Sequence, residues 1–210
     1  MPTPAPARKR RKEARPSELL AAALSLFVDK GYAATRLEDV ATLAGVSKGT
    51  LYLYYANKEA LFMAVIQEGI VPVLAENEEI AARHTGSSFA LLEKLLEHWW
   101  SRIGCTAYAG IPKLMVAEAR NFPEIAAYYY RNVIARGRAL VGAALQRGMD
   151  SGEFRRLDIE QTIDVVIAPV LMLLIWDFSL GHFKDTPSDT NAYLAVHMDL
   201  MRQGLCVPRV

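Results

Sequence analysis

The chain has 210 residues, of which 52% are hydrophobic and 22% are charged, a composition typical of a folded globular protein. The net charge is only +1, which excludes a chain that is disordered throughout, because disorder requires low hydrophobicity and high net charge. Two cysteines, Cys105 and Cys206, are too few for a disulfide-stapled secreted scaffold or a zinc cluster.

Basic residues are concentrated at the start of the chain. Residues 1–16 contain six basic side chains and one acidic side chain, whereas residues 63–210 contain 14 basic and 17 acidic side chains. A basic front on a mildly acidic body favours contact between the front and a polyanion. A solvated tail would have the same composition, so the neighbouring segment has to decide between the two interpretations.

Helix caps and helix-ending glycines predict four helices in the first 83 residues. Short polar side chains cap the free N–H groups of a first turn, and glycine is favoured just after a last turn. The predicted helices cover residues 17–30, 37–44, 47–54 and 57–83. The signals are Ser17, the capping-box pattern Thr35-Arg36-Leu37-Glu38, Ser47 and Asn57 at the starts, and Gly31 and Gly45 at the ends.

Five further helices are predicted in the rest of the chain, and no segment shows the alternation of a strand. They begin after Thr85-Gly86-Ser87, near Pro112, at Pro123, at Asp158 and after Asp189. The fold class is therefore predicted as all-α, with about nine helices. Pro169 should kink or locally unwind the eighth of them.

Two apolar runs resemble export or membrane segments. Leu19–Val28 follows the basic stretch, but acidic residues bracket it closely and its large apolar residues have helical spacing. Val165–Trp176 holds twelve apolar residues, fewer than the roughly twenty that span a bilayer. We expect neither a cleaved leader nor a membrane span, and we expect the second run to form a helix covered on more than one face.

The segment Leu37–Ala56 has the features of a helix-turn-helix. Gly45 supplies the tight turn between two short helices, and Ala41 is a small residue where the helices must approach each other. Val40, Val46 and Leu51 are spaced to fill the wedge between them. A plain corner between two helices would share these features, so the polar residues of the third helix must separate the two interpretations.

The third predicted helix opens with Ser47-Lys48-Gly49-Thr50. A recognition helix presents such residues to base edges and its first amides to phosphate. Gly49 costs about 0.5–1 kcal/mol of helix stability relative to alanine, which a close approach of backbone to DNA would justify. Tyr52 and Tyr54 can bond phosphates, although one of them can equally be core, and Lys58 is unfavourable at a helix start unless phosphate or solvent faces it.

On these residues the chain resembles the DNA-binding domain of TetR/AcrR-type transcriptional regulators. The similarity is specific over about residues 15–65 and weaker beyond them. Tyr54-Tyr55 stands where many relatives have histidine or tyrosine followed by phenylalanine. The matching segments are Phe27, Gly31, Tyr32, Val40-Ala41, Ala44–Tyr52, Tyr54-Tyr55 and Lys58–Phe62.

The resemblance implies a ligand-responsive homodimeric regulator that binds palindromic operator DNA and is released by a small apolar or aromatic effector. Residues 1–14 would be a basic disordered arm, residues 15–62 the DNA-binding domain with its helix-turn-helix at about 37–56, and residues 63–210 the effector-binding and dimerisation domain. Repression and a cytoplasmic location are likewise implied, and activation stays open.

Site residues follow from the resemblance by position. Thr35 and Arg36 would contact the DNA backbone, Lys48 to Thr50 the major groove, and Lys58 a phosphate. The predicted DNA-binding residues are Thr35, Arg36, Ser47, Lys48, Gly49, Thr50, Tyr52, Tyr54 and Lys58, with Arg8–Arg15 as an arm beside the groove.

The C-terminal body holds aromatic and soft apolar side chains of the kind that line small-molecule pockets, and also of the kind that fill cores. The candidate effector-binding residues are Trp99, Ile103, Met115, Glu118, Phe122, Tyr129, Met172 and Trp176. In the family, the last two helices pair with their mates in the dimer. The candidate interface residues are Val166, Val170, Leu174, Tyr193, Val196, His197 and Leu200.

Two alternatives remain. A small-molecule-processing all-α enzyme is disfavoured, because the four histidines lack metal-ligand spacing and neither a glycine-rich phosphate loop nor a GxSxG motif is present. We therefore expect no catalytic residue, no metal site and no cofactor. A helical DNA-binding protein without an effector would bind DNA non-specifically and would not respond to ligands.

Overall fold

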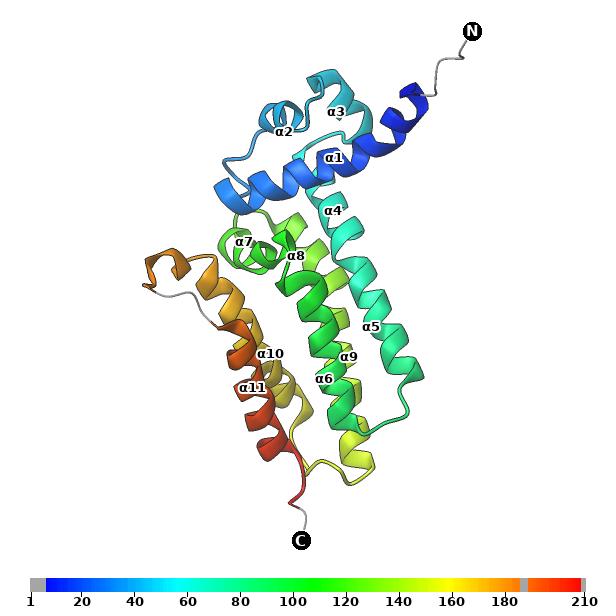
Figure 1. Cartoon of the computed structure of the whole chain (residues 1–210), viewed down its shortest axis with the longest axis vertical. Coiled ribbons are helices and arrows are strands. Elements are labelled where there is room, and N and C mark those ends of the chain that lie inside the picture. Colours follow the sequence, from blue (N-terminus) through cyan, green and yellow to red (C-terminus); the bar gives the residue numbers. More distant parts are fainter. Residues whose placement is uncertain (1–6, 186–188, 209–210) are drawn as a thin grey trace.

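The computed structural model describes residues 7–185 and 189–208, with side chains described from residue 16 onward. Within these ranges all regular secondary structure is helical, apart from one isolated β-bridge between Phe154 and Cys206. In Figure 1 the first three helices lie across one end of the molecule, and the remaining helices run away from them as a bundle. The all-α prediction is confirmed.

The N-terminal helices come mostly where the caps predict them. The Ser47 hydroxyl accepts from the Thr50 N–H at 3.1 Å, and the Asn57 side chain accepts from the Ala60 N–H at 2.7 Å. The elements are α1 (Ala7–Lys30), α2 (Leu37–Leu43), α3 (Lys48–Tyr54), α4 (Lys58–Gly69) and α5 (Val71–Arg83).

The predicted helix over 57–83 is divided into α4 and α5 at Ile70. Pro72 lies in the first turn of α5, where its missing N–H interrupts the hydrogen-bond ladder. The next helices are α6 (Ser88–Trp99), α7 (Ile111–Glu118), α8 (Pro123–Tyr129), α9 (Ala135–Asp150), α10 (Ile159–Asp177) and α11 (Thr190–Leu205). Short π or 3₁₀ turns cover Trp100–Gly104, Ala107–Gly110, Tyr130–Ile134 and Gly181–Phe183.

Helix α1 starts earlier than predicted. Ser17 does not cap it, and residues 7–14, predicted as part of a disordered arm, form its first two turns. Residues 7–15 are mostly alanine, arginine, lysine and glutamate, which favour helix and allow α1 to continue through Pro16 despite the lost hydrogen bond. The rest of the predicted arm, residues 1–6, lies outside the described residues.

The predicted capping box before α2 is also wrong. Arg36 is the N-cap and makes no side-chain cap bond. The Thr35 hydroxyl donates instead to the carbonyl oxygens of Gly31 at 2.7 Å and Leu26 at 3.1 Å. The Thr35 hydroxyl, which the sequence pattern predicted to cap α2, therefore bonds carbonyl groups of α1 and of the residue after it.

One apolar core crosses the predicted domain boundary, which itself falls inside α4. Phe27 of α1 and Phe62 of α4 are fully buried, and they share a cluster with Ile111 of α7 and Tyr129 of α8. Helices α1 to α4 are therefore packed directly on the rest of the described chain, without a flexible linker between them.

Helix α10 is covered on one face only. By length and composition it is apolar enough to cross a membrane, and 28% of its most apolar stretch is buried. Val170 and Leu174 are buried, whereas Val165, Met172 and Trp176 are exposed. The chain itself thus covers one face of α10, and a cover for the second face, expected from a partner subunit, stays a prediction. Helix α10 continues through Pro169 without unwinding.

Candidate nucleic-acid interface and internal cavity

The turn between α2 and α3 is fixed by backbone hydrogen bonds around Gly45. The Gly45 N–H bonds the Thr42 carbonyl at 3.1 Å, and the Val46 N–H bonds the Ala41 carbonyl at 2.9 Å. This is the Schellman pattern, and it requires the left-handed conformation that Gly45 adopts with φ +67°. Buried Ala41 and Leu51 then pack α2 against α3, as predicted.

The start of α3 is open to solvent. Ser47, Lys48 and Gly49 are exposed, and Thr50 is half-buried. A Cβ atom added at Gly49 would meet only the Ser47 hydroxyl, at 3.8 Å. Because no neighbour fills the space in front of Gly49, another macromolecule can approach the α3 backbone closely there.

Lys48 is paired within the chain. Its ammonium bonds Glu38 of α2 and lies 5.7 Å from the centre of the Tyr52 ring. The hydrogen bond from Lys48 holds the pKa of the Glu38 carboxyl below its usual value. Both groups are exposed, so a phosphate can replace the carboxylate as the partner of Lys48 at little cost.

The two tyrosines of α3 differ in burial. Tyr52 is exposed, whereas Tyr54 is half-buried and packs against the core. Between them Leu53 is 84% exposed, and sequence reasoning missed it. Its position two residues after buried Leu51, on the opposite side of α3, was the available signal. An exposed apolar side chain here suits contact with a thymine methyl group.

Two of the predicted DNA contacts are turned into the fold. The Thr35 side chain is buried, with its hydroxyl bonded as described above. The Lys58 ammonium donates to the carbonyl oxygens of Tyr32 at 2.7 Å, Ala33 at 3.1 Å and Thr35 at 3.1 Å. The Lys58 ammonium and the Thr35 hydroxyl thus have partners within the fold, whereas Arg36 is exposed. The phosphate role of Lys58 stays a prediction that these contacts do not favour.

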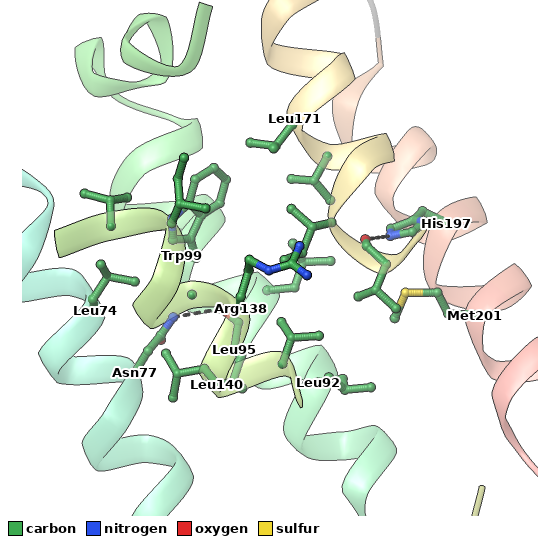
Figure 2. A pocket seen from close by; sticks show the side chains of 18 of the residues that line it. Leu74, Asn77, Leu92, Leu95, Trp99, Arg138, Leu140, Leu171, His197 and Met201 are labelled. Atoms are coloured by element: carbon green, nitrogen blue, oxygen red, sulfur yellow. Dashed lines mark hydrogen bonds between the residues drawn. The ribbon is translucent and has the colours of Figure 1, made fainter. Parts of the chain in front are cut away.

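An internal cavity of about 180 Å³ lies among α5, α6, α9, α10 and α11. Figure 2 shows leucine side chains and Trp99 around it, and labels the polar side chains Arg138, Asn77 and His197. Of the predicted effector-binding residues, Trp99 and Tyr129 line it. Further lining residues that the sequence did not reveal include Leu74, Leu92, Leu95, Arg138, Leu171 and Met201.

The other predicted effector-binding residues lie elsewhere. Ile103 and Met115 belong to the core, and Phe122 packs its ring 4.5 Å from that of Tyr32. Met172 and Trp176 are exposed on α10. Six of the predicted residues, Ile103, Met115, Glu118, Phe122, Met172 and Trp176, therefore do not line this cavity, because side chains of the same type at helical spacing serve cavity, core and surface alike.

Glu118 connects the two parts of the molecule instead. Its carboxylate accepts from the Ala33 N–H at 3.2 Å and from the Asn121 amide at 3.3 Å. Nearby, the Tyr128 hydroxyl donates to Gln67 at 2.8 Å. Glu118 at the end of α7 thus holds the loop between α1 and α2, and Tyr128 of α8 holds α4.

Two polar groups of the cavity are held by backbone or side-chain partners. The His197 Nε2 lies 3.0 Å from the Val166 carbonyl, so it must carry the proton of that hydrogen bond. Burial lowers the pKa of His197, which keeps the ring neutral at pH 7. Asn77 donates to the Leu95 carbonyl at 3.4 Å and lies 2.7 Å from the His98 ring.

The predicted interface residues fall on two opposite sides of α10 and α11. Val166, Val170, Leu174 and His197 are buried within the single chain, which does not favour their predicted role in an interface. Tyr193, Val196 and Leu200 are exposed on α11, beside the exposed Val165, Met172 and Trp176 of α10. Sequence periodicity could not choose the outward face of α10, because α10 is apolar nearly all round.

Known proteins share both halves of this architecture. Residues 19–65 match the family of bacterial regulatory proteins, tetR family, and residues 82–179 match the tetracyclin repressor-like C-terminal domain. The HTH-type transcriptional regulator RutR of Escherichia coli is 35% identical over 116 residues, which span 51% of this chain and about half, 55%, of that relative.

Two further proteins extend the similarity along the chain. The HTH-type transcriptional repressor KstR2 of Rhodococcus jostii is 29% identical over 94% of both chains. The structure of FadR from Bacillus subtilis, in complex with stearoyl-CoA, superimposes with a TM-score of 0.69 at 20% identity, covering 90% of this chain and 98% of that one. With its helix-turn-helix and its helical C-terminal domain, the chain belongs to the TetR family of transcriptional regulators and is not an enzyme.

Proposed function

We propose that the protein is a homodimeric, ligand-responsive repressor in the cytoplasm that binds a palindromic operator and leaves it when an effector occupies the cavity. The observation that carries the proposal is one molecule with both an open recognition helix and an apolar cavity, joined by a continuous core.

The DNA-binding surface consists of the start of α3 and its neighbours. Ser47, Gly49 and Thr50 would face base edges, and Lys48 would exchange Glu38 for a phosphate. Arg36, Tyr52 and Tyr54 would contact the DNA backbone. Leu53 joins this set because it is the most exposed large apolar side chain of α3.

The cavity is the proposed effector site. Its lining is almost wholly apolar, and Tyr129 and Val133 belong both to the lining and to the core that reaches α1 and α4. A ligand that moves these side chains would therefore displace the DNA-binding helices. FadR from Bacillus subtilis was solved with stearoyl-CoA, which supports a hydrophobic effector for this chain as well.

The exposed apolar face of α10 and α11 supports a dimer. Val165, Met172 and Trp176 on α10 and Val196 and Leu200 on α11 would otherwise leave a large apolar surface in water. A two-fold pairing of this face would cover the surface and give two recognition helices for the two half-sites of a palindrome.

A fluorescence-anisotropy titration tests the proposal. The full chain is titrated onto the intergenic DNA beside its own gene and onto unrelated DNA of equal length, at two salt concentrations. We expect binding to the first DNA to survive unlabelled competitor, with a specificity ratio above about 1,000. Equal, salt-sensitive binding to both DNAs would contradict it and favour a helical DNA-binding protein without an operator.

A further inference from the structure

Arg138 lies at the boundary between the internal cavity and the surface. It belongs to the lining of the cavity and also to that of a shallower hollow between α9 and α10, which includes Ala139, Gly142 and Ile159. Figure 2 shows its guanidinium among the apolar side chains of the cavity, directed toward α10. The Arg138 side chain therefore borders both the apolar cavity and the outer hollow.

A positive charge at this place is unusual because the rest of the lining carries none. Among the described lining residues, Arg138 is the one with a permanent charge, and the other polar side-chain groups are those of Asn77 and His197, the Tyr129 hydroxyl and the Trp99 N–H. Its partners come from α10: the guanidinium bonds Asp164 and lies 3.1 Å from Glu160. Two carboxylates thus already occupy an anion-binding fork at the mouth of an apolar cavity.

The two carboxylates are much more exposed than the arginine. The Arg138 side chain is 26% exposed, against 62% for Asp164 and 76% for Glu160. Asp164 and Glu160 can therefore return to water easily, whereas Arg138 needs a replacement partner because it is partly desolvated. A ligand carboxylate arriving beside it would provide one.

We propose that the effector is an amphiphilic carboxylate whose apolar tail fills the cavity and whose head binds Arg138 in place of Asp164 and Glu160. This inference rests on the proposed function, and it specifies the chemistry of its effector. A guanidinium fork fits a carboxylate with two parallel hydrogen bonds, and the leucine-rich lining accepts an alkyl or aromatic body without polar groups.

Replacing Asp164 and Glu160 by a ligand carboxylate at Arg138 would also change the contact between α9 and α10. Glu160 and Asp164 stand four residues apart on α10, where two unneutralised carboxylates repel each other. Losing Arg138 therefore removes a link between α9 and α10 and leaves like charges adjacent on α10. Because the cavity of about 180 Å³ is smaller than the roughly 300–1,000 Å³ of typical ligand sites, a ligand tail needs this separation of α9 from α10 to fit.

The test is calorimetric titration of the full chain, without DNA, with octanoate, octanol and octylamine at pH 7.5. The three probes share one tail and differ only in the charge of the head. We expect octanoate to bind at least tenfold more tightly than octanol, and octylamine not to bind measurably. From hexanoate to decanoate, affinity should rise about fourfold per methylene, the factor that corresponds to ~0.8 kcal/mol for each buried methylene.

Three variants locate the head group. Arg138→Gln should weaken octanoate at least tenfold and leave octanol unchanged. Asp164→Asn should tighten octanoate severalfold, because it removes a competing carboxylate. Arg136→Gln is the matched control, since Arg136 lies on the same helix, pairs with Glu78 at 2.8 Å and does not line the cavity; it should change neither affinity.

Equal affinities for octanoate and octanol, or octanoate binding that Arg138→Gln leaves intact, would overturn the inference. The absence of binding by any probe would overturn it too. If Arg138→Gln does not fold, Asp164→Asn still tests the inference, because it should tighten octanoate binding rather than weaken it. Operator binding is measured on separate samples, so specific DNA binding without any response to carboxylates would refute this effector class and leave the regulator itself intact.

Discussion

Single residues with the same chemistry have different roles in this protein. Lys48 and Lys58 both lie at helix starts in the DNA-binding unit, and sequence reasoning gave both of them to DNA. Lys48 is exposed and paired with one carboxylate, whereas the Lys58 ammonium is surrounded by three carbonyl oxygens and lies 4.5 Å from the centre of the Tyr32 ring. Lys58 therefore fastens the loop between α1 and α2 to α4.

Replacing Lys58 by methionine tests this structural role. The substitution keeps the apolar stem and removes the ammonium, so carbonyls that accepted from a charged donor lose it. We expect the free energy of unfolding to fall by about 2 kcal/mol, measured by urea denaturation. Lys30→Met is the control, because Lys30 makes only an exposed pair with Asp39 at 3.6 Å, and it should change stability by less than about 0.5 kcal/mol. Equal stabilities, with a smaller salt slope of DNA binding for Lys58→Met, would restore the phosphate role.

His197 gives stability a pH dependence. Burial lowers its pKa in the folded protein, so below about pH 6.5, the ordinary value, the unfolded chain binds the proton more readily than the folded one. The stability that His197 contributes is complete above that pH and decreases as the pH falls toward the lowered value.

Glutamine at position 197 isolates this contribution. It retains an N–H for the Val166 carbonyl and does not titrate, so the difference in unfolding free energy between pH 7.5 and 5.5 should be smaller in His197→Gln than in the wild type. The exposed His182 provides the control, and His182→Gln should keep the wild-type pH profile. Parallel profiles for all three proteins would mean that His197 is not responsible.

At the scale of elements, helix α3 combines stability with access. Its N-cap, Ser47, and its buried anchor, Leu51, hold the helix in place. Gly49, between these two, weakens the helix and leaves its backbone uncovered. Gly49, the residue of α3 that is least favourable for a helix, therefore lies where DNA would approach the backbone closely.

Alanine at position 49 separates the two effects. The added methyl group has room, so we expect the unfolding free energy to rise by about 0.5–1 kcal/mol. Operator affinity should nevertheless drop at least tenfold, because the methyl group occupies the space that DNA would take. Gly137→Ala, on α9 at the cavity, also meets no neighbour, and with no effector present it should stabilise the protein without changing operator affinity. Unchanged operator binding by Gly49→Ala would show that the α3 backbone does not approach DNA closely.

At the scale of the whole molecule, the cavity, the domain junction and the uncovered face lie on one connected body. Tyr129 lines the cavity and belongs to the core, and the Glu118 carboxylate accepts a hydrogen bond from the Ala33 N–H in the DNA-binding unit. Helix α10 lines the cavity with one face and exposes its apolar opposite face to solvent. A shift of α10 relative to α9 would therefore act on both the junction and the dimer.

An aspartate at Val196 tests the dimer. Val196 is 60% exposed on α11, and a carboxylate there would be buried without a partner in the paired state, at a cost of about 3 kcal/mol. We expect the dimer dissociation constant to rise at least about 100-fold, measured by light scattering over a concentration series. Val116→Asp, at a similarly exposed site (69%) on α7, should leave the dimer intact. A dimer that is unaffected by Val196→Asp would rule out this face.

Local signals in the sequence determined the helices and the turn of the recognition motif. The caps Ser47, Asn57 and Asp158 act within one helical turn, and Gly45 is required by hydrogen bonds between residues at most five apart. Interactions of this range depend little on the rest of the fold, so pattern reasoning found them and, through them, the family.

Tertiary structure alone decided which side of each helix faces the cavity, the core or solvent. Helix α10 is apolar nearly all round, and apolar residues recur at helical spacing in α6 to α9, so several packings satisfy the same periodicity. The partners of Lys58 and Arg138 are at least 22 residues away along the chain, and Ala33, which Glu118 binds across the junction, is 85 residues away. Long side chains find such partners only after the helices have packed, and for this reason the loop clamp, the domain junction and the charged cavity mouth were not visible in the sequence.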